Sequence, residues 1–247
     1  MAYPQYKGKH TFKGFINPSE VGDPSGRSAK LPKKCILTYQ PWDMTYFRRK
    51  YGKPFRAADF HRFKVLYSKK LAFAMIEGIG SPMAVSVMEK LISMGCREFI
   101  NIGVAGGLSG WGYFLCEKAL RDEGTSHHYE KHSGFAYPDK IMTNRLGRSM
   151  AATGIEFRKA PGWTIDAPYR ETKKEVNHYR KMGIATVDME ASALFVVARY
   201  RGARIASAFA VSDVLNRKKW KTKFGHPDTR EMQYRLIDAA VRCFSCK

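Results

Sequence analysis

The chain has 247 residues, 44% of them hydrophobic, and a formal net charge of +21. This length suits one sizeable α/β domain with a full core, and no apolar run approaches the length of a membrane span. The first residues lack the apolar segment of a secretory signal. These properties argue against a membrane-spanning or secreted protein, and we expect a cytoplasmic one.

The positive charge is spread over several short runs of lysine and arginine, including residues 30–34, 48–56 and 217–223. Such a surface attracts anions. Nucleic acid, a nucleotide substrate and a negatively charged partner are all compatible with it, as is a general bias of composition that serves solubility. The charge alone does not choose among them.

Cysteine and histidine spacing gives no metal site. Five cysteines are an odd number, which favours reduced thiols over a disulfide framework. Cys243 and Cys246 have a spacing that zinc sites use, but no second pair supplies the other two ligands. His128 and His132 lack a carboxylate partner. We therefore expect no metal.

In chain order, residues 1–34 are rich in Lys, Gly, Pro and Ser, and we expect an extended arm over the surface or onto a neighbouring subunit. We expect residues 35–247 to form the one folded domain. A strand at 35–38 ends in a turn at 39–43, and the apolar runs 64–67 and 71–76 predict a hairpin.

The middle of the chain alternates between strand and helix signals. Ser81 and Pro82 start a helix that ends before Gly95, and a strand at 98–102 leads into a glycine-rich turn at 103–107. Residues 111–137 read as irregular. The stretch 162–170 reads as a strand followed by a turn, and residues 171–182 as a charged surface helix.

The last third predicts a buried helix at 189–200, a buried strand at 205–211 and a final helix at 230–243. Strands that alternate with helices indicate a central mixed β-sheet flanked by helices on both faces. We therefore expect a single-domain α/β fold.

Two carboxylates bracket the buried helix and strand. Glu190 lies one residue into the apolar helix, and Asp213 follows the strand. Carboxylates in apolar surroundings are costly unless paired, and ligands in α/β proteins bind at strand ends, so both residues are candidates for a site. A helix-start acid and a loop or cap acid are the structural alternatives.

Three stretches together resemble the nucleoside phosphorylase-I family, which includes purine nucleoside and uridine phosphorylases and methylthioadenosine/S-adenosylhomocysteine nucleosidases. The stretches are 77–82, 101–107, and 187–190 followed by 211–213, which read EGIGSP, NIGVAGG, and VDME followed by VSD. The resemblance covers the chain from about residue 35 to its end.

The resemblance implies cleavage of a nucleoside N-glycosidic bond without cofactor or metal. Met189 and Glu190 would hold the ribose, and Asp213 would protonate the base, which favours a purine because N7 can take the proton. This suits the chemistry, since the sugar becomes positive and the base negative as the bond breaks. Family members assemble as dimers or hexamers, so a homo-oligomer is expected.

The other site residues are likewise implied by the resemblance. Tyr169 would stack on the base, Arg170 would reach a base carbonyl, and Ser212 would also lie at the base. The backbone of Val104, Ala105 and Gly106 would line the pocket.

The chain departs from the phosphorylases where they bind phosphate. Their first turn resembles Gly-Asp-Pro-x-Arg, and an Arg precedes their later glycine turn, which contains Ser. Here the first turn contains Asp43, and the second offers Asn101 and Val104. In the nucleosidases an acid in this first turn, where the phosphorylases have Arg, activates the attacking water. Asp43 matches that position and is the candidate base for hydrolysis. Its structural alternative is a turn or cap residue.

Several alternatives stay open. The first is a phosphorylase, purine or uridine, whose inorganic phosphate is bound by basic residues from elsewhere in the chain. A second is a nucleosidase acting on a nucleotide 5′-monophosphate, with Lys219 or Lys221 as anion contacts. A third is a non-catalytic protein that binds nucleic acid or other anions.

Overall fold

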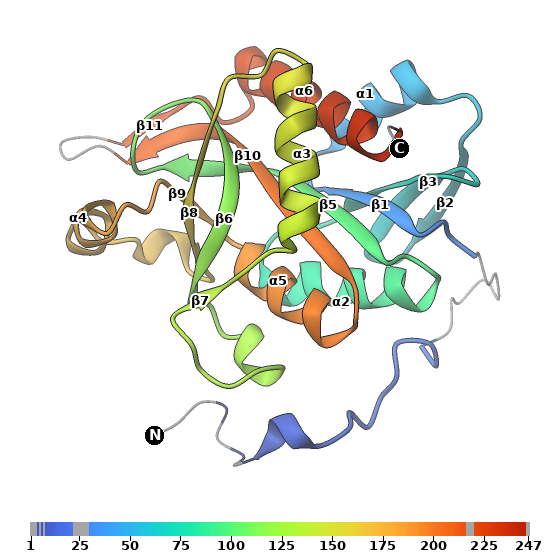
Figure 1. Cartoon of the computed structure of the whole chain (residues 1–247), viewed down its shortest axis with the longest axis horizontal. Helices are drawn as coiled ribbons and strands as arrows, with labels where there is room; N and C mark the ends of the chain where they lie inside the picture. Colours follow the sequence, from blue (N-terminus) through green and yellow to red (C-terminus); the bar gives the residue numbers. More distant parts are fainter. Residues whose placement is uncertain (1–3, 5, 7, 22–29, 216–219, 246–247) are drawn as a thin grey trace.

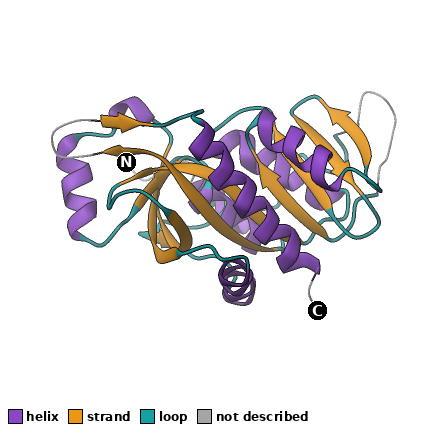
Figure 2. Ribbon diagram, turned by 90° about the horizontal axis from the view of Figure 1, so that it is seen from above, coloured by secondary structure: helices purple, strands orange, loops and turns teal. Residues whose placement is uncertain are grey.

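The computed structural model describes residues 4, 6, 8–21, 30–215 and 220–245. Their strands form one mixed sheet with helices on both faces, so the expected single-domain α/β class is confirmed (Figures 1 and 2). None of the described helices is long and apolar enough to cross a membrane.

The first half of the sheet contains the expected strands and one that the sequence did not predict, at residues 56–60. It contains β1 (Lys34–Thr38), β2 (Arg56–Phe60), β3 (Phe63–Tyr67), β4 (Ala72–Ile76) and β5 (Glu98–Gly107). β3 and β4 pair antiparallel, as the hairpin prediction requires, and β1 lies parallel between β4 and β5. The glycine-rich stretch is part of β5, so the predicted turn at 103–107 is wrong. These glycines pair with β9 and β10, and this pairing keeps the chain extended.

The second half of the sheet closes on itself. It contains β6 (Tyr113–Asp122), β7 (Phe135–Ala136), β8 (Phe157–Ile165), β9 (Thr186–Asp188), β10 (Arg204–Leu215) and β11 (Trp220–Thr222). β5 pairs with β10, β10 with β6, β6 with β8, β8 with β9, and β9 again with β5. The stretch predicted to be irregular therefore supplies the long strand β6, a correction to the sequence-based assignment.

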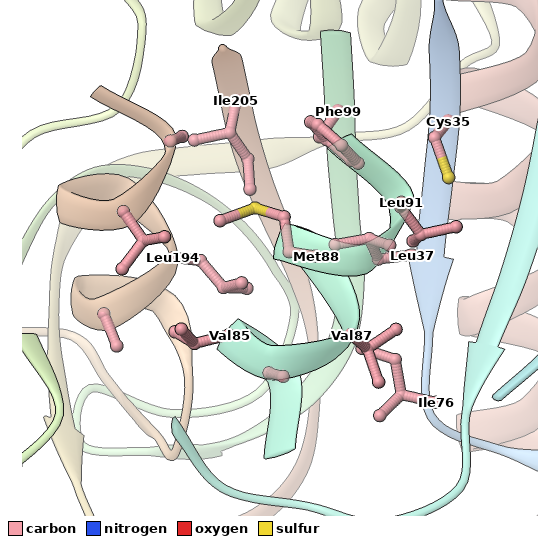
Figure 3. Close-up of a cluster of buried hydrophobic side chains, with 14 of the residues drawn as sticks. Cys35, Leu37, Ile76, Val85, Val87, Met88, Leu91, Phe99, Leu194 and Ile205 are labelled. Carbon is pink, nitrogen blue, oxygen red and sulfur yellow. The ribbon is translucent and has the colours of Figure 1, made fainter. Parts of the chain in front are cut away.

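Two layers of helices cover the sheet. α2 (Ser81–Ser93) and α5 (Ala191–Tyr200) pack together on one face, where Val85, Met88 and Leu194 meet Phe99 and Ile205 of the strands (Figure 3). The other face carries α1 (Pro41–Tyr51), α3 (Lys140–Ala152) and α6 (Pro227–Ser245). α4 (Lys173–Lys181) lies apart from both groups, beside β8 and β9 (Figure 1).

Neighbouring residues of β1 show how the sheet builds two cores. Cys35 and Leu37 face the α2 and α5 layer, whereas Ile36 faces the α1, α3 and α6 layer. Because successive side chains of a strand point to opposite faces, a strand that is apolar throughout must be covered on both sides.

Part of the N-terminal segment crosses the body of the domain. Residues 9–11 form a short 3₁₀ helix, and the His10 ring nitrogen Nε2 lies 2.7 Å from the carbonyl oxygen of His127. The described part of the arm thus lies against its own subunit. The phenyl ring of Phe15 remains fully exposed.

Candidate active site

A cavity of about 830 Å³ opens where β5, β9 and β10 end beside the loops after β1 and β8. Four carboxylates line it, and among its described lining residues Lys173 is the only cation. This is the edge at which ligands bind in α/β sheets. The cavity brings together eight of the predicted site residues, which are Val104, Ala105, Gly106, Tyr169, Met189, Glu190, Ser212 and Asp213.

Glu190 lines the cavity, and two hydrogen bonds hold it, one to its side chain and one from its backbone N–H. The Gly80 N–H donates to Glu190 Oε1 at 2.6 Å, and the Glu190 N–H donates to Asp188 Oδ2 at 3.0 Å. Gly80 adopts φ 95°, a left-handed conformation that favours glycine, so the turn before α2 can present its amide. Met189 is fixed through its carbonyl, which accepts a bond from the Ser81 hydroxyl at 2.7 Å.

The acidic pair Asp188 and Glu190 is electrostatically unusual. Burial, and then the neighbouring Asp188 charge, hold the pKa of Glu190 above its ordinary value. Burial also raises the pKa of Asp188, although bonds from Thr164 and from the amides that begin α5 oppose the rise. The Asp188 carboxylate accepts the N–H groups of Glu190, the N-cap residue of α5, and of Ala191, so it satisfies the amides at the start of this helix.

Asp213 faces the cavity from within β10 and not from the end of that strand. The register shifts between Val211 and Asp213, and β10 then continues in pairing with β11. Two donors hold the carboxylate: Trp220 Nε1 bonds Oδ2 at 2.8 Å, and the Ser212 hydroxyl bonds Oδ1 at 2.8 Å. Ser212 is thus placed to orient Asp213.

Gly106 lets the strands approach closely beside Asp213. A Cβ atom at Gly106 would lie 2.8 Å from Leu215 Cδ1, 2.9 Å from Val187 Cγ1 and 3.4 Å from Asp213 Oδ2. Contacts below 3 Å would force these side chains to move. A glycine is therefore needed here for packing around the acid.

Tyr39 forms another wall of the cavity. Its hydroxyl donates to Asn101 Oδ1 at 2.8 Å, and Asn101 Nδ2 donates to Ser207 Oγ at 3.2 Å. Burial, followed by the charges of Glu190 and Asp188, holds the pKa of Tyr39 well above its ordinary value. The phenol is therefore neutral and serves as a hydrogen-bond donor.

Asp43 lies behind this wall and does not line the cavity. It is completely buried, accepts a bond from the Thr38 hydroxyl, and accepts a second from Gln233 Nε2 at 3.2 Å. Its Oδ1 atom has no partner among the described residues. Burial raises the pKa of Asp43 to about 7.

The remaining predicted contacts lie at the edge of the site or outside it. Tyr169 lines the rim but is fully exposed, and Arg170 borders a separate shallow depression beside Asp166. Lys221 does not line the cavity, because its neighbour Trp220 takes the inward position on β11. Lys219 lies outside the described residues.

The lining residues that the sequence did not identify as site residues include Tyr39, Glu171 and Trp220. Burial, and then the Asp213 charge, raise the pKa of Glu171 to about 7. Trp220 belongs to a stretch of alternating basic and aromatic residues, and that alternation was a usable signal for a strand with one apolar face.

Among the described residues, no group of three or more His, Cys, Asp and Glu side chains could hold a metal ion.

The comparisons of the sequence with known proteins identify phosphorylases. The model of the phosphorylase superfamily matches residues 21–243. A guanosine phosphorylase from Halorubrum lacusprofundi is 28% identical over 67% of this chain and 70% of its own length. A DeoD-type purine nucleoside phosphorylase from Shewanella denitrificans is 24% identical over 72% of this chain and 79% of its own length.

Solved structures agree on the fold. The AMP nucleosidase of Bacteroides thetaiotaomicron superposes with a TM-score of 0.75 at 19% identity, covering 92% of this chain and 98% of that one. A uridine phosphorylase from Vibrio fischeri also has a TM-score of 0.75, at 21% identity, covering 90% of this chain and 95% of that one.

Proposed function

Because the chain belongs to the phosphorylase superfamily, we propose that it cleaves the N-glycosidic bond of a purine nucleoside with water as the nucleophile. The relatives named above are phosphorylases of nucleosides and a nucleosidase. The observation that carries the proposal is the scarcity of cationic groups in the cavity, since its described lining residues include one lysine, no arginine and four carboxyl groups.

Glu190 is the proposed sugar-binding group. With Gly80 bonded to one carboxylate oxygen, the carboxylate can still accept bonds from the ribose hydroxyls. Positive charge develops on the sugar as the bond breaks, and an adjacent carboxylate stabilises it. Met189 lies beside Glu190 in the cavity and contributes an apolar surface for the sugar.

Asp213 is the proposed acid. In its protonated form it donates to N7 of the purine, so that the base leaves as a neutral molecule. Trp220 and Ser212 fix the two oxygens of this carboxyl group, which sets the direction of the transferred proton. Tyr169, at the rim, is the proposed stacking partner of the base, whereas Arg170 lies in the separate depression and would need to turn toward the cavity to reach the base.

Water is favoured over phosphate on electrostatic grounds. A phosphate dianion needs cationic or N–H donors, and it is repelled by carboxylates. Asp43 is the proposed base. Because this carboxyl group does not line the cavity, its role requires a water molecule that bridges Oδ1 and the sugar.

The test is a panel of purine and pyrimidine nucleosides, each assayed with and without inorganic phosphate. We expect base and free ribose from a purine nucleoside at a rate that phosphate does not change. Release of ribose 1-phosphate in a phosphate-dependent reaction would instead assign a phosphorylase. Salt-sensitive binding of RNA or DNA without any base release would assign a binding protein.

Lys173 supports a second candidate substrate, a nucleoside 5′-monophosphate. It is the one described cation on the cavity wall, at the first residue of α4, where the helix dipole adds to its positive charge. Comparison of AMP with adenosine tests this candidate. Equal rates for the two would remove it.

A further inference from the structure

Three polar side chains, one in the cavity wall and two behind it, have no part in the bond cleavage proposed above. Tyr39 follows β1, Asn101 lies in β5 and Ser207 lies in β10, and they form a chain of hydrogen bonds of 2.8 and 3.2 Å. Asn101 and Ser207 are completely buried. Buried polar groups that satisfy one another fix a single arrangement, so the Tyr39 ring is held in place.

The ring occupies a definite end of the cavity. It packs over Gly103, where an added Cβ atom would lie 3.7 Å from the ring carbons. Gly103 stands three residues before Gly106 on β5, or about 10 Å along the strand. Gly106 pairs with Asp213, so Tyr39 and the proposed acid mark opposite ends of the cavity. The sugar-binding carboxylate of Glu190 lines the same cavity as Tyr39.

Displacement at the anomeric carbon requires the nucleophile to approach from the side opposite the leaving base. With the base at Asp213, that side is the Tyr39 end. A neutral ring fills it, backed by the neutral side chains of Asn101 and Ser207. The ring takes the room that phosphate would need there, whereas a water molecule needs much less.

We propose that Tyr39, held by Asn101 and Ser207, is the specificity residue that closes the nucleophile end of the cavity to phosphate and admits water. This inference rests on the proposed function. In the reaction it permits, the water oxygen bonds to C1′ and a water proton passes to the base, Asp43. The electron pair of the C1′–N bond leaves with the purine, which takes its proton from Asp213.

The experiment compares wild type with Tyr39→Phe, Tyr39→Ala and a matched control, Tyr67→Ala. Tyr67 is also a partly buried tyrosine, but it lies on β3 and does not line the cavity. Each protein is assayed for ribose and ribose 1-phosphate with and without inorganic phosphate. Phosphate-induced shifts of the melting temperature report phosphate binding even where the chemistry has failed.

We expect only Tyr39→Ala to form ribose 1-phosphate, at a level at least about tenfold above wild type, and to be stabilised by phosphate. Tyr39→Phe keeps the ring and should stay phosphate-independent. A folded Tyr39→Ala that hydrolyses nucleosides but neither binds nor uses phosphate overturns the inference and leaves the proposed function standing. Phosphate-dependent cleavage by wild type removes both.

Discussion

Trp220 donates its indole N–H to Asp213 Oδ2 across the β10–β11 pair at 2.8 Å, so a residue on a three-residue edge strand orients the candidate acid. Hydrogen bonds to charged groups contribute more than neutral ones, about 1.5–3 kcal/mol. The short strand β11 is thus a functional part of the site.

This bond predicts the effect of Trp220→Phe. The phenyl ring keeps an apolar wall but cannot donate, so Asp213 loses one of its two positioning bonds. We expect kcat/KM for the purine nucleoside to fall about tenfold or more, which corresponds to about 1.4 kcal/mol. Trp111→Phe is the matched control, because Trp111 is also partly exposed but does not line the cavity. Equal rates for both variants would show that the indole N–H is dispensable.

Glu190→Gln separates catalysis from stability. The amide keeps an oxygen for the Gly80 N–H but loses the charge that stabilises the sugar, so we expect kcat to fall by about 10² or more. Steady-state kinetics on the purine nucleoside provide the measurement. An unchanged kcat would remove Glu190 from the chemistry.

The same variant has a pH-dependent effect on folding. Burial and Asp188 raise the pKa of Glu190 in the folded state, so folding disfavours its charged form. Wild-type stability therefore declines as pH rises above the ordinary carboxyl range toward the raised pKa. The uncharged amide of the variant has no such loss. The melting temperature of the variant relative to wild type should increase from about pH 5 to about pH 9, and a constant difference would contradict the pKa shift.

Asp43→Asn tests the proposed base. Asp43 must be deprotonated to accept a proton from water, so kcat/KM of wild type should rise with pH through about 7. The variant should lose about 10² in rate and also lose this rise. Glu171→Gln is the control, because the pKa of Glu171 is also raised to about 7. If the pH dependence disappears in the Glu171 variant instead, the titrating group is Glu171.

The sequence predicted those parts of the fold that local patterns determine. Continuous apolar runs identified β1, the β3–β4 hairpin and α5, since β1 and β4 are buried on both faces and α5 forms a complete helix. The pairing of Glu190 with Asp213 in one cavity followed from the resemblance. These are the parts in which a short stretch of chain carries its own signal.

The other parts of the fold depend on pairing between strands that are far apart in the sequence. β6 includes the charged residues Lys118, Arg121 and Asp122, so its sequence lacks the apolar run of a buried strand. It is a strand because β8 and β10 lie on either side of it. The alternation around Trp220 can indicate a strand with one apolar face, but the side that faces the cavity depends on the pairing of Trp220 with Leu215.

The substitution Gly106→Ala tests how strongly the position of Asp213 depends on the close packing of the strands at Gly106. The added methyl group would meet Leu215 and Val187 below 3 Å and press on Asp213, so we expect a loss of about 1–3 kcal/mol in the free energy of unfolding. Activity should fall further than stability explains, because Asp213 is displaced. Gly134→Ala is the matched control, since no atom lies within 4 Å of a Cβ atom there. Denaturant unfolding and kcat/KM measured on both variants check the prediction, and a fully active Gly106→Ala protein would contradict it.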